Sequence, residues 1–126
     1  MEVAGLGLPD VFMCRNNYPL VPPLPFIPSQ EAVGEVIAVG DQASESMMGK
    51  RVLGPTLFQK QQGGLAEECL MIAPMALPIP DTMSGEEAAG FFIPYQTAWI
   101  GLVHRARLSE TDTVLVLGAP RTTRGA

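Results

Sequence analysis

Short apolar stretches separated by glycine and proline fill the first eighty residues of the chain. The pattern predicts strands over residues 32–39, 49–53 and 65–72, and a further extended segment over residues 76–80. Turn signals close these stretches at Gly40-Asp41, Gly54-Pro55 and Gly63-Gly64. Short strands at intervals of about ten residues are typical of a small β-barrel or sandwich.

Helical patterns occur in three stretches of the sequence. Pro9 and Asp10 predict the start of a short helix that runs to Arg15. Ser84 and Glu87 have the spacing of a capping box and predict a second helix that ends at Pro94. A third helix is predicted over residues 95–108. Its apolar stripe contains Ala98, Trp99, Leu102, Val103 and Ala106.

Two other segments are distinctive. Five prolines between Tyr18 and Pro28 exclude helix and interior strand and predict a rigid surface segment. Near the end of the chain, the sequence TVLVL at residues 113–117 predicts a strand, and Gly118-Ala119 predicts a turn directly after it. A strand followed by such a turn is how a dinucleotide-binding βαβ unit begins.

Composition narrows the possible functions. The 126 residues suit a single domain, and the net charge of −5 argues against a nucleic-acid partner, whose phosphates require clustered cations. No apolar run has the length of a membrane span. Cys14 and Cys69 lie far apart without a metal-binding spacing, and no secretory signal pattern precedes them. We therefore expect reduced thiols and a cytoplasmic location.

The motifs occur in an order that resembles the medium-chain dehydrogenase/reductase superfamily, most closely its zinc-independent quinone oxidoreductase branch. The resemblance rests on GLGLPD (5–10), YP (18–19) with LPFIP (24–28), EAVGEVIAVG (31–40), GKRV (49–52), GGLAE (63–67), LPIP (77–80), EAAG (87–90) and YQTA (95–98). These motifs cover nearly the whole chain up to Ala119.

The resemblance implies a β-rich α+β fold. It predicts a partial GroES-like barrel with a C-terminal helical hairpin and the first strand of an absent Rossmann domain. On this reading residues 1–83 form part of the catalytic domain, residues 84–112 are linking helices, and residues 113–126 open a truncated nucleotide-binding domain. The family has further strands before the position of Met1, so we expect the barrel to lack its opening strands.

The resemblance also predicts that no zinc is bound. Zinc-dependent relatives hold the metal with a cysteine and a histidine at positions that are Gly7 and Gln30 here. Neither glycine nor a neutral amide replaces a thiolate or an imidazole. Asp10 and Glu31 are kept at matching places, and we expect them to hydrogen-bond the turn to the barrel rather than to act in catalysis.

In the zinc-independent branch, hydride passes directly from NADPH to a quinone or enone, and the protein orients both partners. The resemblance assigns Tyr18 to catalysis, by orienting a quinone oxygen, although its ring could equally pack on the proline segment. It assigns Phe12 and Thr97 to the nicotinamide end of the cofactor. The alternative for Thr97 is that it is a residue at the start of a helix whose side chain hydrogen-bonds its own backbone. Relatives often have tyrosine at Phe12 and asparagine at Gly7, so polar contacts expected there are missing.

Gly118 and Ala119 remain as a remnant of the pyrophosphate turn. The small residues expected further along are Arg121 and Arg124, which predict a basic tail rather than a phosphate site. We therefore expect a fragment of an NADPH-dependent quinone or enone oxidoreductase that is inactive alone and binds NADPH weakly or not at all. The alternative is a non-catalytic binding module or decoy subunit that pairs with a full-length homologue. Self-association through exposed strand edges is expected in either case.

Overall fold

The computed structural model describes residues 1–41 and 43–117, which divide into two compact units. The first unit is Met1–Ile93 and the second is Pro94–Ala126.

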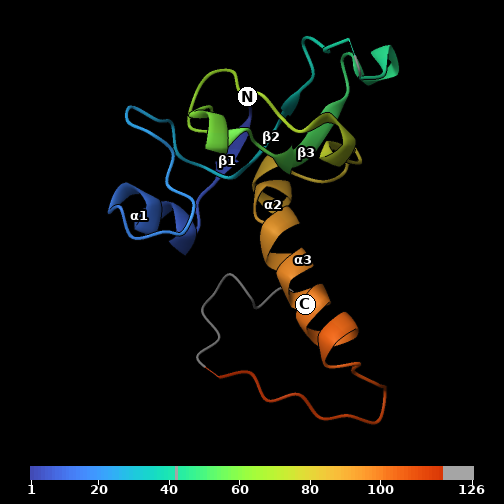
Figure 1. Ribbon diagram of the computed structural model, residues 1–126. Coiled ribbons are helices and arrows are strands. Elements are labelled where there is room, and N and C mark those ends of the chain that lie inside the picture. The colour runs from blue at the N-terminus through green and yellow to red at the C-terminus, as the bar shows by residue number, and fades with distance from the viewer. Residues whose placement is uncertain (42, 118–126) are drawn as a thin grey trace. The chain divides into compact units, whose positions relative to one another are not determined.

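A four-stranded antiparallel sheet is the framework of the first unit (Figure 1). The strands are β1 (Val3–Gly5), β2 (Glu31–Glu35), β3 (Arg51–Pro55) and β4 (Leu77–Pro78), and they lie side by side in that order. Val33 of β2 pairs with Val3 on one side and Leu53 on the other. The sheet confirms the β-rich class predicted from the sequence.

Three of the predicted extended stretches form strands, β2, β3 and β4, with shifted ends. β2 ends at Glu35, four residues before the predicted end at Val39, and β3 runs on through Gly54 to Pro55. The predicted strand over residues 65–72 is wrong: this stretch contributes only an isolated bridge between Met71 and Thr56. A strand needs a partner along its length, and alternation alone does not supply one.

β1 was not predicted, because a three-residue strand in a glycine-rich stretch has too few positions to show a period. Three 3-10 turns complete the connections of this unit: η1 (Glu45–Met47), η2 (Phe58–Lys60) and η3 (Ala73–Met75).

Helix α1 (Leu8–Cys14) forms where Pro9 and Asp10 predicted it. The helix is terminated after Cys14 by a turn in which Asn16 adopts a positive φ of 54°. Asn16 N–H donates to the Met13 carbonyl (3.0 Å) and Asn17 N–H to the Phe12 carbonyl (2.8 Å), which is the hydrogen-bond pattern of a Schellman motif. Local sequence therefore fixes both ends of this helix.

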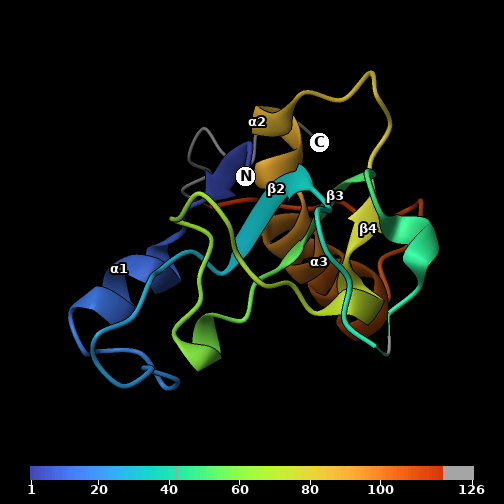
Figure 2. The same cartoon turned by 90° about the horizontal axis from the view of Figure 1, so that it is seen from above.

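The hydrophobic core lies where α2 (Gly85–Ala89) packs on β1 and β2 (Figure 2). The predicted capping box is present: Glu87 N–H donates to Ser84 Oγ (3.2 Å), and Ser84 N–H donates to Glu87 Oε2 (3.1 Å). The buried members of this core are Val33, Leu53, Ile79, Ala88, Ala89 and Phe92.

The boundary between the last two helices differs from the prediction. α2 ends at Ala89, and α3 (Phe92–Trp99) runs through Pro94, which lies in its first turn, where the missing N–H breaks no helical hydrogen bond. The chain continues from α3 as a π-helical segment, η4 (Ile100–Arg105), in which Ala106 N–H donates to the Gly101 carbonyl at 2.9 Å. The predicted single α-helix over residues 95–108 is therefore wrong in its start and in its last turns.

Residues 113–117 form no strand, contrary to the prediction. They have high β propensity but lie beside no paired strand within the described residues, and all five are exposed. Trp99, Leu102 and Val103, which belong to the predicted apolar stripe, are exposed as well. Within residues 1–41 and 43–117, no helix combines the length and the apolar character needed to cross a bilayer.

Candidate functional site

The turn before α1 is held by one buried carboxylate. Asp10 is 5% exposed, and its Oδ2 accepts the Gly7 N–H at 2.9 Å while its Oδ1 accepts the Ser29 N–H at 2.9 Å. The first bond caps α1 at its N-terminus, where negative charge is favourable. The second bond ties α1 to the residues that lead into β2.

Ser29 lies at the centre of this junction. It is fully buried and has a φ of 82°, and its Oγ lies 2.9 Å from the Gly5 carbonyl oxygen and 2.8 Å from the Glu31 carbonyl oxygen. Its own carbonyl accepts Thr56 Oγ1–H at 2.7 Å and Gly64 N–H at 3.0 Å. One residue thus joins β1, β2, the end of β3 and the Gly63-Gly64 turn.

Glu31 performs a similar function at the other end of the junction. It is 7% exposed, and its Oε2 accepts the Ile93 N–H at the start of α3 at 2.7 Å. Burial raises the pKa of the Glu31 carboxyl above its usual value; the Ile93 N–H opposes that rise, and the nearby Asp10 carboxylate adds to it. The expectation that a carboxylate ties the turn to the sheet is confirmed for Asp10, whereas the Glu31 side chain bonds the start of α3 and not the turn.

Gln30, which lies between Ser29 and Glu31 in the sequence, is also buried. Its carbonyl accepts the Thr56 N–H at 2.9 Å, but its side-chain Nε2 has no hydrogen-bond partner within the described residues. Gly7 offers no side-chain ligand, and Gln30 offers a neutral amide. The donor set at this place therefore does not fit zinc. No cluster of three His, Cys, Asp or Glu side chains suited to a metal occurs in residues 1–41 and 43–117.

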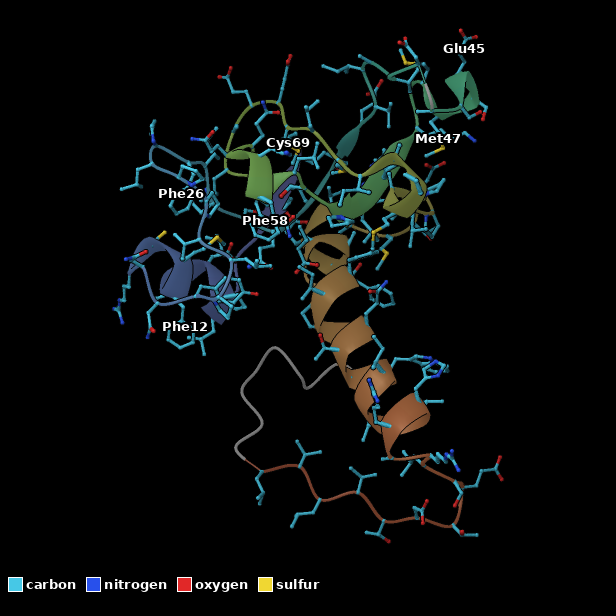
Figure 3. The ribbon with its side chains drawn as sticks, in the orientation of Figure 1. Phe12, Phe26, Glu45, Met47, Phe58 and Cys69 are labelled. Atoms are coloured by element: carbon cyan, nitrogen blue, oxygen red, sulfur yellow. The ribbon has the colours of Figure 1, made fainter. Side chains whose placement is uncertain are left out.

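The sequence assigned four residues to the cofactor and one to catalysis, and three of these five lie within the described residues. Phe12 lies on α1 (Figure 3). Tyr18 lies half-buried in the bend after that helix. Thr97 belongs to the second unit and lies beyond the first turn of α3, so it is not a helix-start residue. Gly118 and Ala119 lie outside the described residues.

The outer face of α1 is apolar. Leu8, Val11 and Phe12 have the i, i+3, i+4 spacing of one helical face and are 64%, 43% and 36% exposed. The opposite face buries Met13 and Asp10. Because the inner face is anchored by the Asp10 bonds, the apolar outer face is held in a fixed position.

Ser29 and Thr56 are the residues of the junction that the sequence did not indicate. Both are buried hydroxyl residues that bond main-chain groups distant in sequence. No local pattern marks a serine in the left-handed region, since glycine and asparagine are the usual residues there.

Residues 1–106 match the family model of the alcohol dehydrogenase GroES-like domain. A quinone oxidoreductase-like protein 2 homolog from Nematostella vectensis is 41% identical over 115 residues, which are 91% of this chain and 31% of that protein.

Two solved structures are similar as well. The human synaptic vesicle membrane protein VAT-1 homolog-like protein has a TM-score of 0.73 at 30% identity, over 85% of this chain and 33% of its own. A putative NADPH:quinone reductase from Bacillus thuringiensis has a TM-score of 0.72 at 32% identity, over 89% of this chain and 33% of its own.

The chain spans about a third of the length of the relatives that it matches. The matched region contains α1, the sheet, α2 and α3, so the comparisons confirm the resemblance to quinone oxidoreductases of the medium-chain dehydrogenase/reductase superfamily. By its sequence match and its four-stranded sheet, the chain belongs to the alcohol dehydrogenase GroES-like domain family.

Proposed function

We propose that this chain is the substrate-side portion of an NADPH-dependent quinone or enone oxidoreductase that works without zinc. The observation that carries the proposal is the fixed apolar face of α1, formed by Leu8, Val11 and Phe12 and followed by the half-buried Tyr18. A flat, electron-poor ring can stack on Phe12, while the Tyr18 hydroxyl donates a hydrogen bond to a carbonyl oxygen of that ring. The 41% identity to a quinone oxidoreductase-like protein supports the assignment.

The described residues do not fit NADPH. The cofactor's diphosphate is usually bound at a free helix N-terminus. In the described residues, a carboxylate of the chain accepts one N–H at the N-terminal end of each of the three α-helices: Asp10 bonds Gly7, Glu87 bonds Ser84, and Glu31 bonds Ile93. These carboxylates would repel a diphosphate. We therefore propose that the 126-residue chain binds the acceptor side weakly, does not hold NADPH, and does not reduce quinones alone.

The state of the two cysteines supports a proposed cytoplasmic location. Cys14 and Cys69 are both free thiols. A cytoplasmic location, where thiols stay reduced, is consistent with this state.

The acceptor site is tested with tetramethyl-1,4-benzoquinone, whose blocked ring positions prevent addition to Cys14. Amide shifts of the isotope-labelled chain should change on α1 and at Tyr18, and Phe12→Ala should weaken binding several-fold. Leu65→Ala, an exposed leucine outside α1, is the matched control and should bind as the original chain does. Shifts that spare α1, or that Phe12→Ala leaves unchanged, would contradict the acceptor site.

NADPH is tested separately by isothermal titration at millimolar cofactor. We expect no saturable binding. Saturable binding in the micromolar range, or quinone-dependent oxidation of NADPH by the chain alone, would show that a complete cofactor site exists and would refute the inactive-fragment proposal.

The non-catalytic alternative has one observation in its favour. Leu115 and Leu117 are 80% and 83% exposed, as they would be on a surface that a partner covers. Co-purification of the tagged chain with a full-length homologue, combined with no quinone-induced shift on α1, would favour this alternative over the acceptor site.

A further inference from the structure

One buried polar atom of the junction has no hydrogen bond. Gln30 is 9% exposed, and its side-chain Nε2 finds no acceptor within residues 1–41 and 43–117. The buried hydroxyls beside it are satisfied: Ser29 Oγ lies 2.9 Å from the Gly5 carbonyl oxygen, and Thr56 Oγ1–H donates to the Ser29 carbonyl at 2.7 Å. A buried amide donor without an acceptor lowers the stability of a fold, so this group calls for a partner.

The Asp10 carboxylate places Gln30 near one end of the apolar face of α1. Asp10 accepts the Gly7 N–H with Oδ2 and the Ser29 N–H with Oδ1, both at 2.9 Å. Gly7 directly precedes Leu8, the first residue of the apolar face, and Ser29 directly precedes Gln30. Leu8 and Gln30 are therefore each one residue away from a main-chain N–H that is bound to the same carboxylate.

The side chain of Gln30 can present its donor to a ligand at small cost. The main chain of this residue is held, because its carbonyl accepts the Thr56 N–H at 2.9 Å. Nε2 is covered in the structure, so a ligand reaches it when the side chain turns outward. Since Nε2 gives up no hydrogen bond in that turn, a ligand that brings an acceptor oxygen adds a hydrogen bond without breaking another.

The surroundings of Gln30 restrict the kind of acceptor. Asp10 and Glu31, which are both buried, each hold a carboxyl group in the same junction. Carboxylates disfavour the approach of a phosphate or of another carboxylate. A neutral amide N–H beside such groups suits a neutral oxygen acceptor, of which the carbonyl group of a quinone or an enone is an example.

We propose that Gln30 is a specificity-determining residue that donates its Nε2–H to a carbonyl oxygen of the ring bound on the α1 face. This inference rests on the proposed function, because it assumes that a quinone or enone lies against Leu8, Val11 and Phe12. A 1,4-quinone has two carbonyl oxygens on opposite sides of its ring, so the Gln30 bond adds to the one proposed for Tyr18. A site that supplies such donors selects a carbonyl-bearing ring over a hydrocarbon of the same shape.

A matched pair of ligands tests this selection. Tetramethyl-1,4-benzoquinone and 1,2,4,5-tetramethylbenzene have the same four methyl groups on the ring, and only the quinone has carbonyl oxygens. Gln30→Met keeps a side chain of similar size without the donor. It should reduce the preference for the quinone about fivefold, the effect of one lost hydrogen bond, and leave binding of the hydrocarbon unchanged. Gln62→Met, the same substitution at an exposed position, should leave both affinities unchanged.

Two further measurements report on the amide itself. In the isotope-labelled original chain, the side-chain amide signals of Gln30 should shift when the quinone is added and stay in place with the hydrocarbon. Without ligand, Gln30→Met should unfold at a higher urea concentration than the original chain, because it removes a buried donor that has no acceptor. Gln62→Met should unfold at the original concentration.

The results separate this inference from the function on which it rests. A reduced quinone preference, a shift of the Gln30 amide and a higher urea midpoint would establish the donor. Unchanged preference in Gln30→Met, while Phe12→Ala still weakens binding, would overturn the donor and leave the acceptor site in place. A lower urea midpoint for Gln30→Met would show that an internal water already satisfies the amide, and would overturn the inference as well. No shift on α1 with either ligand would instead refute the proposed function.

Discussion

The Oδ1 atom of Asp10 accepts the main-chain N–H of Ser29 at 2.9 Å, across nineteen residues of sequence. This buried bond connects the helix that carries Phe12 to the strand that carries Glu31. The proposed acceptor surface is therefore positioned by a structural carboxylate that need not touch the substrate.

Replacing Asp10 with alanine should destabilise the fold strongly. The Ser29 N–H would remain buried without an acceptor, at a cost of about 1–3 kcal/mol, and α1 would lose its N-terminal cap, at about 1 kcal/mol more. Urea unfolding gives the change directly. The control, Asp41→Ala at an exposed turn position, should change stability by less than about 0.5 kcal/mol. Equal effects at the two sites would mean that the Asp10 bonds contribute nothing.

Two substitutions at Ser29 should differ from one another. Alanine removes the Oγ contacts and keeps the positive φ of 82°, whereas glycine removes the same contacts and adopts that φ without steric strain. We expect Ser29→Gly to be about 1 kcal/mol less destabilising than Ser29→Ala. Thermal and urea unfolding of the two variants provide the comparison, and an alanine variant at least as stable as glycine would contradict the argument from strain.

Glu31 should make stability depend on pH in a recognisable direction. Because burial raises the pKa of its carboxyl in the folded state, the folded chain holds this proton more tightly than the unfolded chain does. Its contribution is fully present below the ordinary pKa of glutamate and is lost as pH rises through the raised value.

Glu31→Gln isolates that contribution, since the amide oxygen can still accept the Ile93 N–H. The free energy of unfolding of Glu31→Gln, measured relative to the original chain, should increase as pH rises above the ordinary pKa of glutamate. Glu86→Gln on the exposed side of α2 is the control for general charge effects. A difference between Glu31→Gln and the original chain that stays constant with pH would be inconsistent with the raised pKa.

The chain should contain no stoichiometric zinc after purification without chelator. By the resemblance drawn from the sequence, Gly7 and Gln30 lie where zinc-dependent relatives have a metal-binding cysteine and histidine, and a glycine and a neutral amide are poor partners for Zn²⁺. Elemental analysis by mass spectrometry measures the ratio. One zinc per chain that is lost in the Cys69→Ser variant would contradict the prediction. It would show that the metal is held by ligands other than residues 7 and 30.

The sequence determined the features that depend on near neighbours. Pro9 and Asp10 begin α1, and Ser84 and Glu87 cap α2, because these residues bond groups within the same turn of helix. The ordered motifs likewise identified the family before the sheet was known. In each of these cases the information lies within a few residues, where spacing is visible in the sequence.

Pairing and burial were decided only by the tertiary structure. Residues 65–72 and 113–117 have the composition of strands and form none, whereas the short β1 pairs fully with β2. Ser29, Gln30 and Thr56 gain their importance from main-chain groups and burial that no local pattern encodes. A strand exists only when a second strand lies beside it, and a buried hydroxyl is placed by groups far away in sequence; both conditions depend on the whole fold.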